Sequence, residues 1–201
     1  MRYTEQANRV LEMIRKRGMI RPRDLKEFNI PAEYLQRLYE RGEVQRSGRG
    51  IYTLRDAETT ENFSFAEACK RVPHGVICLL SALRFHQIGT QSPYEVWMAV
   101  HPKAHLPRLD YPPLRIFRFS GTALKEGVEE HQVSDGTFRV YNIPKTVADC
   151  FRYRNKIGLD VALEALQECW REQRTSMDEL WRYAVLARVS TVMKPYLEGL
   201  V

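Results

Sequence analysis

The chain reads Pro22-Arg-Asp-Leu-Lys-Glu-Phe28, then Asn29-Ile-Pro31, then Ala32-Glu-Tyr-Leu-Gln-Arg-Leu-Tyr-Glu-Arg41. The first and third runs have the apolar spacing that predicts two short helices, and Gly42, a residue that adopts positive φ, is typical of a helix end. The run Val44-Gln-Arg-Ser-Gly-Arg-Gly-Ile-Tyr-Thr-Leu54 then predicts a β-hairpin with a basic, glycine-rich tip. Helix, turn, helix and basic hairpin is the order of a winged helix-turn-helix, whose second helix lies in the major groove of DNA while the wing follows the backbone.

A further helix is predicted ahead of this stretch, over residues 4–17, and Gly18 ends it. Its apolar residues recur at the spacing of one buried face, at Ala7, Val10, Leu11 and Ile14. Apolar residues of the next two helices and of the hairpin complete one small core. The positions of the second helix that are left to face outward are Glu33, Gln36, Arg37 and Arg41, with Tyr34 at the border.

The positive charge of the chain is concentrated in the same segment. Residues 1–56 hold 13 Lys/Arg and 8 Asp/Glu, a net charge of +5 out of +6 for the whole chain. Phosphate neutralisation requires such an excess where DNA binds. We expect Gln36 and Arg37 to read bases, and Glu33 and Tyr34 are further candidates for contacts to bases. The residues expected at phosphates, or for a wing arginine in the minor groove, are Arg21, Arg23, Arg41, Arg46, Ser47 and Arg49.

The composition changes after residue 55. The run Asp56-Ala-Glu-Thr-Thr-Glu-Asn62 is polar and predicts a linker, so the expected domains are a winged helix-turn-helix over residues 1–56 and a second domain over residues 63–201. The second domain is expected to hold helices over 64–72 and 76–87, strands over 95–100, 114–119, 128–133 and 138–143, and helices from residues 144, 160, 176 and 190. The expected class is α+β: a winged helix-turn-helix, then a mixed α/β domain with a helical C-terminal tail.

Local signals support several of these elements. Ser134-Asp-Gly-Thr137 stands between two alternating segments, which predicts a hairpin turn. Ser176 with Glu179 three residues later is the pattern of a capping box at a helix start. Pro195 inside the last segment predicts a helix that is kinked or starts late.

The second domain gives little sign of catalysis. Its cysteines are too widely spaced for a zinc ribbon and are expected as buried apolar residues; they are Cys69, Cys78, Cys150 and Cys169. His101 and His105 have ligand-like spacing, but the prolines beside them predict a loop and no metal site. Neither a phosphate-binding glycine loop nor a serine-hydrolase elbow is present. We therefore expect no enzyme activity, no metal and no cofactor.

A nuclease coupled to the DNA-binding module is the enzyme class that stays open as an alternative. Metal-dependent nucleases need clustered carboxylates, typically with an acid-x-Lys pair at a sheet edge. The expected strands carry Glu95 alone and then the adjacent Glu129 and Glu130, and none of them carries acid-x-Lys. This pattern disfavours nuclease activity.

A second basic cluster lies at Lys145, Arg152 and Lys156. Arg152 and Lys156 are four residues apart, so they share a face if the helix continues through them. Such a face is a candidate for a secondary contact to DNA or to a partner, or it is the solvated end of a helix.

No apolar run in the sequence has the length of about 18–20 residues that a membrane span needs. The first residues, Met1-Arg-Tyr-Thr-Glu-Gln6, also lack the apolar centre of a signal peptide. We therefore expect a soluble, cytoplasmic protein.

Three blocks of the sequence, in this order, resemble the AbiEi family: antitoxins of AbiE abortive-infection, type IV toxin–antitoxin systems. The first is the helix-turn-helix with Gly42-Glu-Val-Gln-Arg-Ser-Gly-Arg-Gly-Ile-Tyr52. The second is Val76-Ile-Cys-Leu-Leu-Ser-Ala-Leu-Arg-Phe-His86 leading to Gly89-Thr90. The third is Tyr141-Asn-Ile-Pro-Lys-Thr-Val-Ala-Asp-Cys-Phe-Arg-Tyr-Arg-Asn-Lys156. Together the blocks span most of the chain, and the third is the most distinctive.

The resemblance implies a two-domain protein. Its N-terminal domain would repress its own operon at double-stranded operator DNA, expected to contain inverted repeats. Its C-terminal domain would counter a nucleotidyltransferase-like toxin without forming a stable complex. The nucleotidyltransferase signature, Gly-Ser followed by paired Asp-x-Asp, is absent from this sequence, so the chain is not the toxin. The alternative is a DNA-processing or phage-defence protein in which the winged helix delivers a nuclease-like or protein-interaction second domain.

Overall fold

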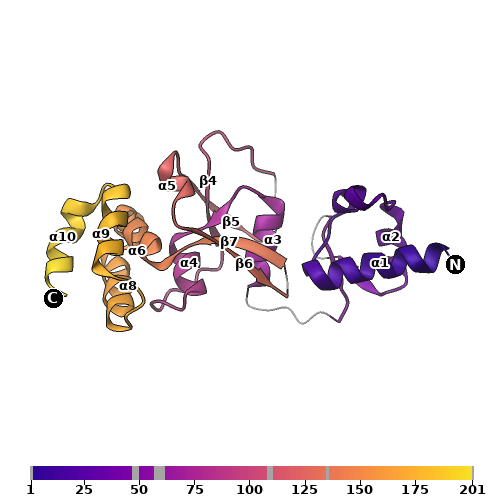
Figure 1. The fold of residues 1–201 in the computed structure, drawn as a ribbon, viewed down its shortest axis with the longest axis horizontal. Coiled ribbons are helices and arrows are strands. Elements are labelled where there is room, and N and C mark those ends of the chain that lie inside the picture. The colour runs from indigo at the N-terminus through magenta and orange to yellow at the C-terminus, as the bar shows by residue number, and fades with distance from the viewer. Residues whose placement is uncertain (1, 47–49, 57–61, 108–110, 135, 201) are drawn as a thin grey trace. The chain divides into compact units, whose positions relative to one another are not determined.

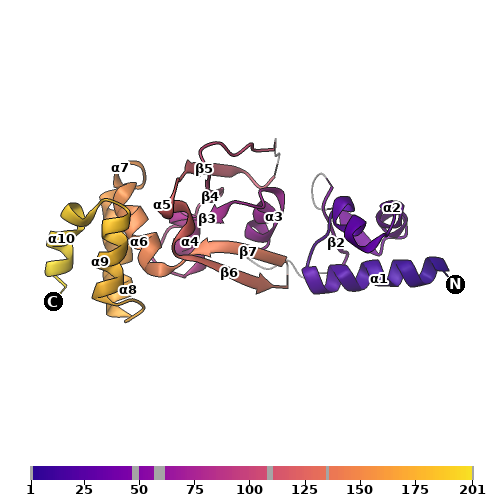
Figure 2. The same cartoon turned by 45° about the horizontal axis from the view of Figure 1, so that its top comes forward.

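The computed structural model of the chain describes residues 2–46, 50–56, 62–107, 111–134 and 136–200. It contains helices together with parallel and antiparallel strands, so the expected mixed α and β class is confirmed (Figures 1 and 2). The contacts divide the chain into two compact units: residues 1–70 with 132–137, and residues 71–131 with 138–201. The first unit thus extends past the expected linker into the helix that follows it.

The N-terminal part of the first unit is built from three helical segments and a short hairpin. They are α1 (Arg2–Arg17), the 3₁₀ helix η1 (Pro22–Phe28), α2 (Glu33–Glu40), β1 (Val44–Arg46) and β2 (Tyr52–Leu54). The core residues buried between them include Val10, Ile14, Leu25, Leu35 and Leu38. Gly18 and Gly42 both have a φ of 71°, which confirms that these glycines end α1 and α2.

One contact of the hairpin is not predicted from the sequence. Ile20 forms an isolated antiparallel bridge with Tyr52. The Ile20 amide donates to the Tyr52 carbonyl at 3.0 Å, and the Tyr52 amide donates to the Ile20 carbonyl at 2.9 Å. Tyr52 also pairs with Arg46 of β1. Ile20 therefore adds a third extended segment beside the hairpin and fixes the hairpin to the residues that lead into η1.

The second unit is organised around a five-stranded sheet with the strand order β5-β4-β3-β7-β6. Its strands are β3 (Val76–Ile77), β4 (Val96–Val100), β5 (Leu114–Arg118), β6 (Val128–Val133) and β7 (Gly136–Tyr141). β4 runs antiparallel to β3 and parallel to β5, while β3 runs parallel to β7, so the sheet is mixed. The tip of the β6–β7 hairpin belongs by its contacts to the first unit.

The helix expected over residues 76–87 is wrong at its start. Val76 and Ile77 form β3, which pairs with Met98 and Ala99 of β4, and α4 (Leu79–Phe85) begins only after them. A short apolar run has no periodicity that separates a buried strand from a buried helix. Val76 and Ile77 form a strand because these β-branched residues pair with two neighbouring strands, and the sequence does not show that pairing.

The remaining helices are α3 (Phe63–Arg71), α5 (Thr122–Lys125), α6 (Ile143–Arg152), α7 (Arg154–Ile157), α8 (Leu159–Arg171), α9 (Met177–Leu186) and α10 (Ser190–Glu198). Of these, α6, α8, α9 and α10 gather at one end of the sheet (Figures 1 and 2). Residues 144–151 of α6 are all buried, so α6 is the central helix of this group. The capping box of Ser176 and Glu179 is confirmed at the start of α9, and Pro195 lies inside α10.

Candidate nucleic-acid interface

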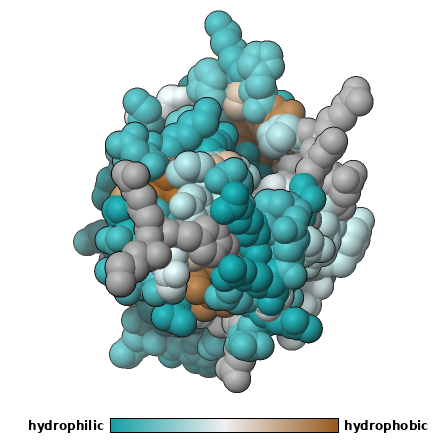
Figure 3. Space-filling view, turned by 90° about the vertical axis from the view of Figure 1, so that its right-hand side faces the viewer, coloured by the Kyte–Doolittle hydropathy of each residue, from teal (hydrophilic) through white to brown (hydrophobic). Residues whose placement is uncertain are grey.

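The outward face of α2 carries the residues expected to read bases. Glu33, Gln36 and Arg37 are exposed, and they lie opposite the fully buried Leu35 and Leu38. This separation follows from helical spacing, because residues that alternate every three or four positions share one face. The surface turned to the viewer in Figure 3, over the N-terminal helices, is mainly hydrophilic, with small apolar areas between the polar ones.

Each of the two central polar side chains of this face contacts a carboxylate one turn away. The Arg37 guanidinium lies 3.4 Å from the Glu33 carboxylate, and the Gln36 amide donates a hydrogen bond of 2.9 Å to the Glu40 carboxylate. The guanidinium carbon of Arg37 is also 6.0 Å from the centre of the Tyr34 ring. Exposed pairs of this kind stabilise a helix by only about 0.2–0.5 kcal/mol, so a ligand of modest affinity can replace them. Glu40 is the residue that the sequence analysis missed, although its spacing from Gln36 is a usable signal.

The residues expected at phosphates are placed around α2 in different environments. Arg23 is exposed on η1, Arg41 is exposed at the end of α2, and Arg46 is exposed at the end of β1 opposite Tyr52. Ser47 and Arg49, expected at the wing tip, lie outside the described residues. Three of the expected phosphate contacts are therefore exposed cations, and Arg41 of these lies at the C-terminal end of α2.

Arg21 differs from these residues because it takes part in the fold of the first unit. Its amide donates to the Asp24 carboxylate at 2.9 Å, and its guanidinium donates to the backbone carbonyl of Lys70. The ammonium of Lys70 in turn lies 2.7 Å from the Asp24 carboxylate. The Asp24 carboxylate thus accepts from the backbone amide at the start of η1, and the ammonium of Lys70 in α3 pairs with the same carboxylate. The guanidinium of Arg21 therefore contacts the Lys70 carbonyl and the Asp24 carboxylate within the first unit.

Replacement of Asp24 by Asn is expected to lower stability by roughly 1 kcal/mol at neutral pH and to change its pH dependence. Burial alone would raise the pKa of Asp24, but hydrogen bonds and charges from Lys70 and Arg21 outweigh burial and hold the pKa below its usual value. A group with a lowered pKa in the folded state stabilises the protein above its unfolded pKa of about 3.9, and this stability is lost as pH falls through the folded pKa.

Urea unfolding at a series of pH values measures both effects. The wild-type protein loses the Asp24 contribution only in acid, so the difference between wild type and Asp24→Asn shrinks there. Glu27→Gln, at an exposed acid of the same 3₁₀ helix, is the matched control and leaves the profile nearly unchanged. Equal losses for the two variants at neutral pH contradict the role of these Asp24 contacts.

The structure corrects the prediction of a surface contact at Lys145. Its side chain is 0% exposed and forms an ion pair with Asp149, which is 1% exposed. The ammonium also lies 4.4 Å from the centre of the Tyr141 ring and 4.9 Å from that of Phe119. A lysine held in this way cannot reach DNA or a partner. The block from Tyr141 to Lys156, in which Lys145 lies, therefore contributes this lysine to the core and not to a binding surface.

The other two residues of the basic cluster remain at the surface. The helix breaks at Tyr153, so Arg152 ends α6 and Lys156 belongs to α7. Both cations nevertheless lie against the same ring: the Arg152 guanidinium is 5.9 Å and the Lys156 ammonium 5.7 Å from the centre of Tyr153. Arg152 and Lys156 are thus brought together, but by a shared aromatic side chain and not by one continuous helix.

The acidic residues in the described part of the chain do not gather into a metal site. Glu95 is paired with Arg115 at 3.1 Å, and Asp149 is buried against Lys145. Within the described ranges no three or more His, Cys, Asp or Glu side chains are close enough to hold a metal ion. Burial raises the pKa of Cys78 well above the usual thiol value and that of Cys169 to about 12, so both thiols are in the unreactive protonated form.

None of the helices in the described part of the chain combines the length and the apolar character that crossing a membrane requires.

The comparison with known families matches the same segment that the sequence motif singles out. Residues 8–55 match the family described as "Transcriptional regulator, AbiEi antitoxin". The match begins in α1 and ends just after β2, so it covers the helices, the hairpin and the outward face of α2. No curated protein matches the chain at a significant level. The resemblance seen in the sequence is thus confirmed over residues 8–55, which are similar to AbiEi transcriptional regulators.

Proposed function

We propose that the protein is a DNA-binding transcriptional repressor of its own operon and the antitoxin of an AbiE-type toxin–antitoxin system. The observation that carries the proposal is the exposed polar face of α2 inside the segment that matches the AbiEi family. The net charge of +5 over residues 1–56 supports it, because a DNA-binding surface needs excess cations. The toxin that it opposes is nucleotidyltransferase-like, and the opposition needs no stable complex.

The proposed binding mode is that of a winged helix-turn-helix. α2 lies in the major groove of operator DNA, where Gln36 and Arg37 contact bases with Glu33 and Tyr34 beside them. Arg23, Arg41 and Arg46 contact phosphates, and Ser47 and Arg49 join them from the wing. The Ile20–Tyr52 bridge supports this mode because it fixes the hairpin to the lead into η1. Arg152 and Lys156 are a secondary contact to DNA or a partner.

The proposal is tested with the region upstream of the gene and with a reporter placed behind that region. We expect the purified protein to protect an inverted repeat there from cleavage, and its expression to lower reporter output. Co-expression with a neighbouring nucleotidyltransferase-like protein should relieve growth arrest. Absence of any protected site within the upstream region contradicts the repressor function, while failure to relieve arrest contradicts only the antitoxin function.

We also propose that the second unit is not an enzyme and that the protein needs no cofactor and acts in the cytoplasm. The purified protein is expected to leave duplex DNA and RNA intact with Mg²⁺ or Mn²⁺ and to transfer no nucleotides. The pairing of Glu95 with Arg115 and the burial of Asp149 support this expectation. Gel assays with supercoiled plasmid and labelled RNA measure it. Metal-dependent nicking that disappears in Glu95→Ala favours the alternative function, a DNA-processing protein with a nuclease-like second unit.

A further inference from the structure

α9 carries an apolar stripe whose first residue, Met177, packs partly against the core and whose other two residues are exposed. Met177, Trp181 and Val185 follow one another at intervals of one helical turn. Trp181 is 43% exposed and Val185 is 54% exposed, whereas Leu180 and Ala184 on the other side of α9 are fully buried. Exposed apolar patches mark interaction sites, and tryptophan is enriched among the residues that contribute most to binding. An exposed tryptophan with apolar neighbours therefore indicates a contact site.

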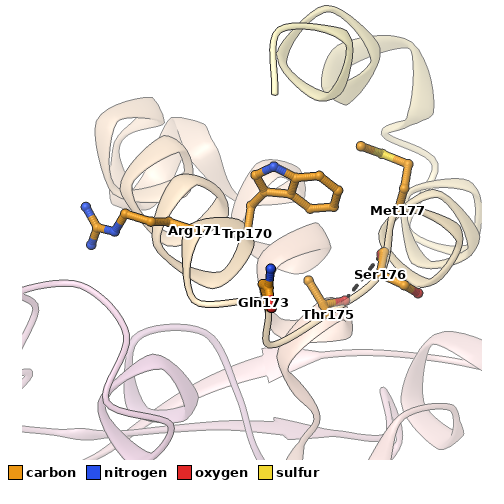
Figure 4. Close-up of a pocket in the computed structure, with 6 residues that line it drawn as sticks. All are labelled: Trp170, Arg171, Gln173, Thr175, Ser176 and Met177. Atoms are coloured by element: carbon orange, nitrogen blue, oxygen red, sulfur yellow. Dashed lines mark hydrogen bonds between the residues drawn. The ribbon is translucent and has the colours of Figure 1, made fainter. Parts of the chain in front are cut away.

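The stripe continues into a hollow beside the start of α9. The hollow has a volume of about 470 Å³ and is lined by Trp170, Arg171, Gln173, Thr175, Ser176 and Met177. Figure 4 shows Trp170 of α8 and Met177 of α9 on opposite sides of it, with their ends directed toward the space between them. The apolar surface of the stripe therefore extends from α9 to the end of α8.

Two opposite charges stand at the two ends of the stripe. Asp178 is exposed in the first turn of α9, and Arg188 is exposed just after its last turn. Neither forms an ion pair with any of the described residues. At 100° per residue Asp178, Trp181 and Val185 fall within about 60° of the helix circumference, so one partner surface can contact all three. The stripe is apolar at its centre, acidic at one end and basic at the other.

We propose that this face of α9 joins two copies of the chain in an antiparallel pair. The charge pattern is self-complementary, because an antiparallel second copy places its basic end against the acidic end of the first. The register is also consistent within α9, where residues 181 and 185 lie symmetrically about residue 183. Asp178 lies five positions before residue 183, and Arg188, which follows the helix with a φ of 59°, lies five positions after it. A single two-fold axis at residue 183 therefore packs Trp181 on Val185 of the second copy and places Asp178 at Arg188, each contact occurring twice.

Such a pair gives a DNA-binding protein two reading segments per particle. Inverted repeats are bound by symmetric dimers, and the second half-site is then occupied at the high effective concentration that linkage provides. The pairing itself does not depend on DNA. It is therefore measured on the free protein, and its failure is distinguishable from failure of the proposed repressor function.

Sedimentation velocity of the full chain over a concentration series measures the pairing. We expect a monomer–dimer equilibrium that Trp181→Ser weakens about tenfold or more, because a buried tryptophan is a typical interface anchor. Tyr94→Ser is the matched control, since Tyr94 is 87% exposed and lies outside the stripe, and it leaves the equilibrium unchanged. A chain that stays monomeric throughout, or a dimer that is indifferent to Trp181→Ser, overturns the proposal.

Charge reversal tests the register. Asp178→Arg alone places two arginines at each end of the pair, and Arg188→Asp alone places two acids there, so each variant alone is expected to dimerise more weakly. An equimolar mixture of the two variants restores both ion pairs and should dimerise as the wild type does. Asp160→Arg, in the first turn of α8, is the matched control, and circular dichroism checks that every variant is folded. A mixture that dimerises no better than its components overturns the antiparallel register.

Discussion

Replacement of Lys145 by Ala is expected to lower the free energy of unfolding by about 3–5 kcal/mol. Lys145 and Asp149 lie one turn apart in α6 and form an ion pair that is almost completely inaccessible to solvent. Removal of the lysine leaves a buried carboxylate without its cation, and the other oxygen of Asp149 has no hydrogen-bond partner in the described structure. The rings of Tyr141 and Phe119 also lose the ammonium that lies against them. Urea unfolding measures the loss.

Two variants separate the charge effect from a packing effect. Lys156→Ala removes an exposed cation and is expected to be nearly neutral. The double variant Lys145→Met with Asp149→Leu removes both charges and should be much more stable than Lys145→Ala, because apolar residues of similar volume replace buried ion pairs at little cost. A double variant that is as unstable as Lys145→Ala shows that the loss arises from packing.

The pH dependence of Lys145→Ala follows from the same pair. Burial raises the pKa of Asp149 above its usual value, and Lys145 opposes this rise. Without Lys145 the folded pKa rises further above the unfolded pKa of about 3.9, so the folded state binds the extra proton between these two values. The stability of the variant therefore falls as pH rises through this window and recovers in acid. A deficit that is equal in acid and at neutral pH contradicts this origin.

Replacement of Arg37 by Ala is expected to weaken operator binding by roughly 1–3 kcal/mol and to leave binding to random DNA nearly unchanged. Its side chain is 50% exposed on the face opposite Leu35 and Leu38, so the change should not disturb the fold. An arginine there can contact guanine with two parallel hydrogen bonds, and this contact is lost only where the guanine is present. Titrations with operator and scrambled duplex at two salt concentrations measure the difference.

Arg49→Ala is the companion variant, because a wing arginine is expected at phosphate or in the minor groove. It should weaken binding to both duplexes by similar factors and lower the salt slope by about one unit. Circular dichroism should find both variants folded. Equal losses on operator and scrambled DNA for Arg37→Ala would mean that α2 only positions the protein and that bases are read elsewhere.

The elements that the sequence predicts well are those whose signals are local. Gly18 and Gly42 end helices because they adopt positive φ, and the Ser176 hydroxyl and Glu179 carboxylate satisfy amides within one turn of chain. The outward face of α2 follows from the spacing of Leu35 and Leu38 alone. Each of these features depends on residues within about two helical turns of one another, so periodicity and capping patterns are enough to predict them.

The features that the sequence does not predict depend on distant partners. β3 is a strand because it lies between β4 and β7, and residue 140 is more than sixty positions away from residue 77. Lys145 is buried because Phe119 and Tyr141 come from other elements to surround its ammonium. Read along the chain, the same lysine is one of several cations near a helix. Only the tertiary structure separates it from Arg152 and Lys156.

In the free protein, carboxylates of α2 bind the two side chains that are proposed to contact bases, so they compete with DNA for these side chains. Glu33 pairs with Arg37, and Glu40 accepts a hydrogen bond from Gln36. In the proposed binding mode both weak contacts are lost when Arg37 and Gln36 turn to the bases. On a phosphate surface without matching bases, the two displaced acids face like charge and nothing replaces them. A base with two acceptors gives the Arg37 guanidinium two new hydrogen bonds, which replace its contact to Glu33. In the proposed binding mode these pairs lower the affinity for random DNA more than the affinity for the operator, so discrimination depends partly on contacts within α2.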